Sequence, residues 1–115
     1  MKRFSRDLIL VGLAGSSLVE CARGISLSAA SEAFPDRTYH PDGTLMPRNR
    51  PGAVLHNPAA VAANDVRLAR EGIRCGEKIV LPDTLCLHGD NETAAENARL
   101  VRQALAAAGM TVRGL

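Results

Sequence analysis

Aromatic residues are scarce in this 115-residue chain, which has no tryptophan, one tyrosine and two phenylalanines. Its core must therefore consist of aliphatic side chains, and hydrophobic residues make up 46% of the chain. Charged residues account for 23%, near the average for a folded domain, which argues against a disordered chain. The length predicts one small domain and is too short for a complete barrel enzyme.

Cysteine is also rare, and the three cysteines show no CxxC spacing. This pattern favours reduced thiols in a cytoplasmic protein over a disulfide framework or a zinc site. Cys86 falls in an apolar run, which favours packing over a nucleophilic role. A net charge of +2 from scattered arginines does not indicate nucleic acid binding. Arg48 and Arg50 form the densest basic pair outside the N-terminus, which fits either a solvated loop or an anion site.

The N-terminus admits two interpretations. Its basic start, apolar run and Leu18-Val19-Glu20-Cys21 segment resemble a lipoprotein signal. Asp7 and Glu20 oppose that interpretation, because one begins the apolar run and the other stands beside the cysteine where a small residue is needed. A strand, a turn and a helix explain Glu20 better. We therefore predict a cytoplasmic protein with no membrane partner.

Periodicity and helix-start signals predict alternating strands and helices. The predicted elements are a strand over 7–13, a turn at 14–15, a helix over 17–24, a strand within 25–34 that ends near residue 32, a loop over 35–56, a helix over 57–72, extended segments over 78–81 and 84–88, and a helix over 92–108. This order implies an α/β fold with parallel strands and right-handed crossovers.

Local signals support the three predicted helices. Ser17-x-x-Glu20 and Thr93-x-x-Glu96 are predicted capping boxes, and Gly109 is a predicted C-cap. Asn57-Pro58 predicts an N-cap followed by the first helical residue. The apolar stripe predicted for the helix over 57–72 consists of Val61, Ala62, Val66 and Ala69, with Asp65 at its border.

The long loop over 35–56 is crowded with proline and glycine. Loops of this length inside compact domains are uncommon and usually functional, for example as active-site lids. His40 and His56 lie in it and are predicted to be solvated or structural.

Polar residues follow the predicted strands at their carboxyl ends, where α/β proteins place their chemistry. The segments 14–16, 32–39 and 88–90 are therefore expected to face the same side. The candidate catalytic residues are Asp36, His88 and Asp90, and the candidate substrate-binding residues are Glu32, Arg37, Tyr39 and Arg48.

Each role has a structural alternative. His88 can act as a general acid or base, or it can be a packed, hydrogen-bonded histidine. Asp36 can accept or orient a proton and Arg37 can hold a carboxylate, or the two can form only a loop ion pair. Asp90 can orient His88 or cap the following helix. No metal-ligand spacing, P-loop, GxGxxG or GxSxG motif is present, so no metal site and no cofactor motif are predicted.

Five segments together carry a family resemblance. They are residues 7–16, 30–39, 41–48, 51–54 and 86–91, and they resemble successive blocks of the LamB/YcsF family in that family's order. Two departures are Pro35, where the family usually has alanine, and a shortened segment near Cys75–Lys78. Family members are about twice as long, and this chain resembles their C-terminal half.

The resemblance implies a partial β/α barrel, like the C-terminal half of the seven-stranded polysaccharide-deacetylase barrel. It also implies ATP-dependent opening of the 5-oxoproline lactam to glutamate with B and C partner subunits, with Mg possible beside ATP. A half barrel leaves strand edges exposed, so a separate N-terminal half or a homo-oligomer is a further expected partner. The alternative is a non-catalytic remnant that at most binds a partner protein.

Overall fold

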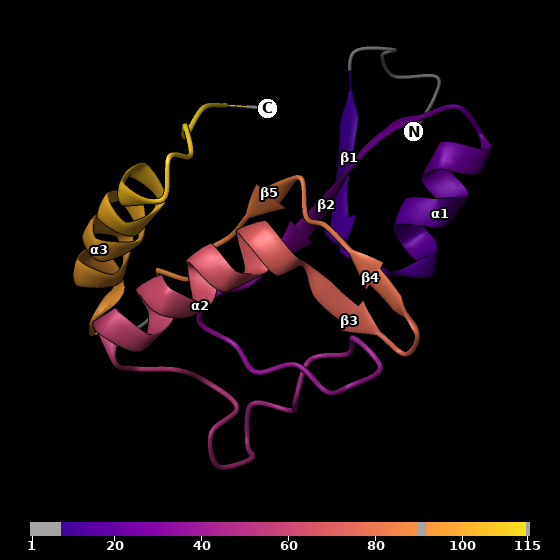
Figure 1. Cartoon of the computed structure of the whole chain (residues 1–115). Helices are drawn as coiled ribbons and strands as arrows, with labels where there is room; N and C mark the ends of the chain where they lie inside the picture. Colours follow the sequence, from indigo (N-terminus) through magenta and orange to yellow (C-terminus); the bar gives the residue numbers. More distant parts are fainter. Residues whose placement is uncertain (1–7, 90–91, 115) are drawn as a thin grey trace.

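A three-stranded parallel sheet organises the molecule (Figure 1). The computed structural model describes residues 8–89 and 92–114. The sheet contains β1 (Ile9–Leu13), β2 (Ser28–Ala33) and β5 (Thr84–Leu85), in the order β1-β2-β5. Its helices are α1 (Ser17–Gly24), α2 (Pro58–Glu71) and α3 (Ala94–Ala107). The expected parallel α/β arrangement is confirmed.

All three helices cover the same face of this sheet. A Cβ added to Gly12 of β1 would lie 3.0 Å from a methyl group of Val19, which places α1 on that face. Ala33 of β2 packs in one core cluster with Leu68 of α2, and Leu85 of β5 packs against the cluster shared by α2 and α3. The strand register puts these three sheet positions on one side. Ile9, Val11, Glu32 and Thr84 therefore lie on the opposite side.

Helices α2 and α3 run parallel to each other. The Thr93 hydroxyl donates to the His56 carbonyl near their N-terminal ends, and the Arg70 guanidinium donates to the Ala108 carbonyl near their C-terminal ends. Val61 and Ala62 of α2 pack with Val101 and Leu105 of α3. No described helix is long and apolar enough to cross a membrane.

The segment after α2 corrects the predicted strand assignment. β3 (Ile73–Cys75), which the sequence pattern did not predict, pairs antiparallel with β4 (Lys78–Val80). The extended segment over 78–81 therefore belongs to a hairpin instead of the parallel sheet. Gly76 has a φ of +67° in the two-residue loop, a conformation that favours glycine. Of the segment 84–88, only Thr84 and Leu85 form a strand.

The helix caps follow the predictions only in part. The Asn57 side chain accepts from the backbone N–H groups of Ala59 and Ala60, as predicted, and Pro58 begins α2. Both predicted capping boxes are wrong. Helix α1 has Ser16 as its N-cap without a side-chain cap hydrogen bond, and the Thr93 side chain makes no cap hydrogen bond at α3. The Thr93 hydroxyl donates to His56 and Glu96 pairs with Arg99, so each group has a competing partner.

Ser26 occupies the left-handed position that ends α1. Its φ is +61°, and it is the non-glycine residue with positive φ in the described chain. Its N–H donates to the Arg23 carbonyl while the Leu27 N–H donates to the Ala22 carbonyl, which together form a Schellman motif. Glycine occupies this conformation without the steric cost that a side chain carries.

Ser26→Gly should therefore raise the free energy of unfolding by about 0.5–1 kcal/mol, because relief of strain exceeds the added unfolded-state entropy. Urea unfolding followed by circular dichroism measures this change. Ser28→Gly, in the exposed first position of β2, is the matched control and should destabilise. A loss of stability in Ser26→Gly equal to that of the control would contradict the prediction.

Candidate functional site

Asp36 and His88 form a hydrogen-bonded pair just beyond the carboxyl ends of β2 and β5. The His88 Nδ1 atom lies 2.9 Å from Oδ2 and 3.1 Å from Oδ1 of Asp36. The His88 backbone N–H also donates to Asp36 Oδ2, at 3.2 Å. Asp36 is only 1% exposed, whereas a quarter of the His88 side chain is exposed. The two residues meet because β2 and β5 are parallel neighbours.

The carboxylate determines which nitrogen of His88 carries a proton. An ionised carboxylate only accepts hydrogen bonds, so the Nδ1 atom beside Asp36 is the donor. In a neutral ring, Nε2 is then the nitrogen that can accept a proton. This arrangement is that of a histidine whose orientation and tautomer are held by a buried acid.

Phe34 stacks on the ring of His88, a contact that the sequence pattern did not predict. Their ring centroids lie 5.0 Å apart with an interplanar angle of 19°. The Phe34 N–H donates to the Tyr39 hydroxyl at 2.9 Å, which ties the two ends of this turn together. Phe34 is one of only two phenylalanines and stands two residues before Asp36, which is the signal that could have singled it out.

Burial and negative charge keep two nearby side chains protonated. Burial raises the pKa of the Tyr39 phenol, while the hydrogen bond from Phe34 acts in the opposite direction. Burial also raises the pKa of the Cys86 thiol, and the charges of Glu32 and Asp36 raise it further. A thiol with a raised pKa is a poor nucleophile, which supports the packing role predicted for Cys86. All three cysteines lie in the described part of the chain and form no disulfide.

Arg37 points into the long loop instead of pairing with Asp36. The Arg37 Nη2 atom donates to the Met46 carbonyl at 2.8 Å, and its backbone bridges to Val54. The residue is 8% exposed, and its buried Nε atom has no hydrogen-bond partner. The alternative of a loop ion pair between Arg37 and Asp36 is therefore wrong, because the Asp36 carboxylate faces His88.

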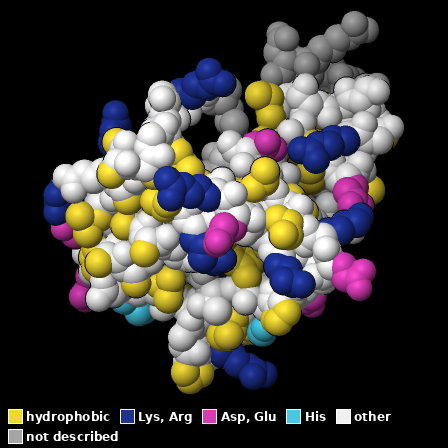
Figure 2. Space-filling model, viewed as in Figure 1, with side chains coloured by type: hydrophobic (Ala, Val, Ile, Leu, Met, Phe, Trp, Pro, Cys, Tyr) yellow, Lys and Arg dark blue, Asp and Glu magenta, His cyan; other side chains and the backbone are white. Residues whose placement is uncertain are grey.

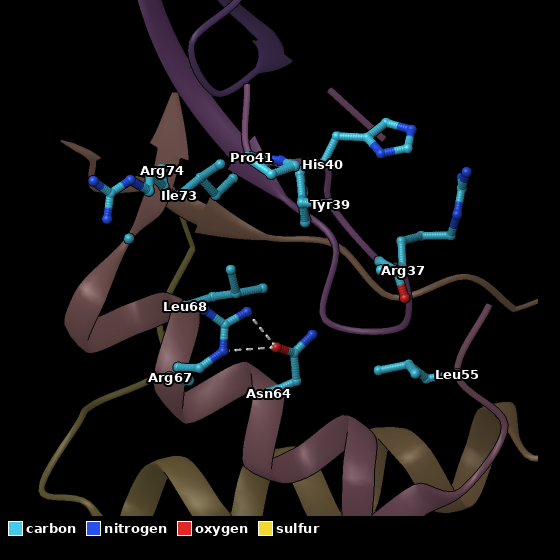
Figure 3. Close-up of a pocket in the computed structure, with 12 residues that line it drawn as sticks. Arg37, Tyr39, His40, Pro41, Leu55, Asn64, Arg67, Leu68, Ile73 and Arg74 are labelled. Atoms are coloured by element: carbon cyan, nitrogen blue, oxygen red, sulfur yellow. Dashed lines mark hydrogen bonds between the residues drawn. The ribbon is translucent and has the colours of Figure 1, made fainter. Parts of the chain in front are cut away.

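A groove of about 360 Å³ lies between this loop and α2. Figure 3 shows Asn64 and Arg67 of α2 on one side of it, opposite Tyr39 and Pro41 of the loop. Asn64 donates to the Pro35 carbonyl at 2.8 Å and accepts from Arg67, so hydrogen bonds hold the α2 side of the groove. Asp36 and His88 do not line it.

The predicted site residues therefore separate into groups. Asp36 and His88 are in contact. Glu32 lies close enough to Tyr39 and Cys86 for its charge to act on both. Arg37 and Tyr39 line the groove. Arg48 is exposed and is not among the residues that line the groove. Asp90 lies outside the described residues.

The turn after β1 does not open onto this site. Its Ala14 is buried against Leu68 and Ile73, and a Cβ on Gly15 would lie 2.7 Å from the Cys75 Sγ atom. The β3–β4 hairpin therefore covers this turn. The three strand ends lie at the same edge of the parallel sheet, as expected, but the hairpin covers the end of β1.

The described residues contain neither a cluster of metal ligands nor a P-loop for a nucleotide. No three His, Cys, Asp or Glu side chains there gather in a way that could hold a metal ion. The glycine-rich loop that cradles phosphates in P-loop proteins is also missing from the sequence. The residues present do not fit a nucleotide site of that kind, so no chemical step is assigned to ATP on this chain.

Comparison with known proteins decides the family. The model of the LamB/YcsF family matches residues 1–115. This chain belongs to the LamB/YcsF family. It is 46% identical to the A subunit of 5-oxoprolinase from Methylococcus capsulatus, over 100% of this chain and 46% of that relative. It is 45% identical to the A subunit of the Pyrococcus furiosus 5-oxoprolinase, over 95% of this chain and 44% of the relative.

A solved structure supports the LamB/YcsF assignment at the level of the fold. The lactam utilization protein from Thermus thermophilus superposes with a TM-score of 0.83 and 38% sequence identity. The match covers 99% of this chain and 47% of that one. The chain thus spans about half the length of the LamB/YcsF relatives that it matches, as the resemblance predicted.

Proposed function

We propose that this chain supplies one wall of the lactam-opening site of an ATP-dependent 5-oxoprolinase, which converts 5-oxoproline to L-glutamate. The Asp36–His88 pair is the observation that carries the proposal, because it places an oriented proton-transfer group at the ends of two parallel strands. The names of its relatives, a 5-oxoprolinase component and a lactam utilization protein, supply the substrate class.

Opening a lactam requires water addition and protonation of the leaving nitrogen. A bond forms between a water oxygen and the lactam carbonyl carbon, the C–N bond breaks, and the ring nitrogen gains a proton. His88 would remove a proton from the water and return one to the nitrogen through Nε2, with Asp36 holding the ring. Glu32 and Tyr39 would position the substrate. Arg37 and Arg48 are the remaining substrate-binding candidates, but the Arg37 guanidinium is buried against the Met46 carbonyl and Arg48 lies outside the groove, so we assign neither of them to the substrate carboxylate.

The wider assembly is part of the same proposal. All three helices cover one face of the parallel sheet, which is the winding of a β/α barrel and fits a partial barrel of the polysaccharide-deacetylase type. The relatives are named as one subunit of an enzyme, which supports partner subunits, and we propose these to be the B and C subunits of a cytoplasmic 5-oxoprolinase. ATP, with Mg, would be used by this complex.

The test combines this chain with the B and C subunits and with the remaining half of a 5-oxoprolinase A subunit. ATP-dependent release of glutamate from 5-oxoproline is the expected result, and omission of this chain should abolish it. A complex that assembles but releases no glutamate would contradict the proposal. That outcome would favour the alternative of a non-catalytic chain that only binds partners, which the half-length match to the relatives also allows.

A further inference from the structure

The groove between the loop and α2 is lined by basic side chains and by no acidic ones. Arg37, Arg67 and Arg74 belong to its lining, and none of the described residues that line it is Asp or Glu. Figure 2 shows Lys and Arg side chains over the face of the molecule on which α2 and the loop lie. A concave site lined by one sign of charge attracts ligands of the opposite sign.

Each of these three arginines donates to a neutral oxygen. Arg37 donates to a backbone carbonyl, Arg67 donates to the Asn64 side chain, and Arg74 donates to the Gly76 carbonyl. Within the part of the chain that the structure describes, no ion pair joins any of them to an acid. Their charges therefore give the groove a positive potential that no neighbouring carboxylate cancels.

Arg67 is the arginine that is held in place for a ligand. The Asn64 Oδ1 atom accepts from Arg67 Nε at 3.1 Å and from Nη2 at 2.7 Å. Asn64 is itself fixed, because its amide group donates to the Pro35 carbonyl. Figure 3 shows the Arg67 guanidinium beside Leu68 on the α2 side of the groove. Its Nη1 atom makes no hydrogen bond within the described chain, so the end of the guanidinium can still donate to a carboxylate or a phosphate.

Arg99 of α3 provides a direct comparison. Glu96 stands three residues before Arg99, the same spacing that separates Asn64 from Arg67, and both of its carboxylate oxygens accept from that arginine. A carboxylate neutralises the guanidinium, whereas an amide orients it and leaves its charge intact. Helix α2 therefore presents an arginine that is oriented but not neutralised. Preorganised binding sites have this property.

The groove also offers apolar contact for the body of a ligand. The apolar side chains in its lining are Pro41, Leu55, Leu68 and Ile73. Its volume of about 360 Å³ lies within the range of pockets that hold small organic molecules. We infer that the groove binds a small organic anion, with its carboxylate or phosphate group on Arg67 and its apolar part against these side chains. The inference does not depend on the proposed reaction, because the Asp36–His88 pair does not line the groove.

Titration of the whole chain with phenyl phosphate and with benzoate, followed by nitrogen–proton NMR, tests the inference. Saturable shifts are expected at the Asn64 side-chain amide and at the Arg67 Nε–H, and any difference in affinity between the probes shows whether the site favours phosphate or carboxylate. Arg67→Gln should weaken binding by about 10-fold or more, because a charge-assisted hydrogen bond is lost. Arg99→Gln is the matched control and should bind normally.

Asn64→Asp is a second variant that keeps the arginine. It places a carboxylate beside Arg67, as Glu96 lies beside Arg99, and should weaken binding to a similar extent. Equal weakening by Arg67→Gln and Arg99→Gln would overturn the inference, because it would show only a general attraction to basic side chains. Inorganic phosphate should bind more weakly than phenyl phosphate, and equal affinity would rule out an organic ligand. Absence of saturable shifts with both probes in the unmodified chain would overturn the inference without any variant.

Discussion

Asp36→Asn should lower lactam opening by the assembled enzyme by about 100-fold or more. The asparagine Oδ1 atom can still accept the His88 backbone N–H, so the local fold should survive. Its amide group would then donate to His88 Nδ1, which forces the ring proton onto Nε2. The ring could no longer accept a proton through Nε2. ATP-dependent glutamate release measures the loss.

Asp42→Asn is the matched control for this prediction. Asp42 is an exposed aspartate in the same loop, and its side chain accepts from the N–H and hydroxyl of Thr44. Its side-chain hydrogen bonds go to Thr44 and not to His88, so its substitution should leave activity near that of the unmodified chain. Nitrogen NMR of the histidine ring reports the tautomer independently of activity. Unchanged activity in an Asp36→Asn protein with the switched tautomer would remove His88 from proton transfer.

Asp65→Ala should raise the free energy of unfolding by about 2 kcal/mol at pH 7.5. Asp65 is fully buried in α2, and neither of its carboxylate oxygens has a hydrogen-bond partner. Burial raises its pKa from 3.8 to about 6, a difference of about two pH units that corresponds to about 3 kcal/mol. Loss of the packing of the Asp65 side chain offsets part of this gain. Urea unfolding at fixed pH measures the change.

The effect of Asp65→Ala has a defined pH dependence. Between pH 3.8 and about 6 the folded state holds the Asp65 proton more tightly than the unfolded state, so this residue makes stability fall as pH rises. The gain from Asp65→Ala should therefore be largest above pH 6 and shrink toward pH 4. Asn97→Ala is the control, because Asn97 is equally buried with an unpaired Oδ1 atom but does not titrate. A gain in Asp65→Ala that stays constant from pH 4.5 to 7.5 would contradict this account.

Asp65 also shows where reasoning from helical spacing fails. The stripe of Val61, Ala62, Val66 and Ala69 placed this aspartate at the border, because apolar residues were taken to mark the buried face. The structure buries Val61, Asp65 and Leu68 together and leaves Val66 and Ala69 partly exposed. Which face of α2 is buried depends on where the sheet and α3 lie. The spacing of apolar residues along the sequence cannot distinguish that face from the neighbouring one.

Structural features that depend on only a few neighbouring residues were predicted correctly when no other group competed for the same hydrogen bonds. The Asn57-Pro58 start of α2 formed as expected, since the side-chain oxygen and the fixed proline φ act locally. The capping boxes failed at Thr93 and Glu96, where His56 and Arg99 supply other partners. The β3–β4 hairpin was missed because its strands have three residues each, too few to show alternation.

By itself, the sequence determined the family, the parallel α/β class and the segments that carry the candidate chemistry. These depend on the order of the motifs and on local conformational preferences, and both are properties of the sequence itself. Only the tertiary structure decided that Asp36 faces His88 instead of Arg37, and that Phe34 stacks on that histidine. Asp36 and His88 are 52 residues apart, and they meet only because β2 and β5 pair side by side. Such a contact depends on the packing of the whole sheet, which no local pattern specifies.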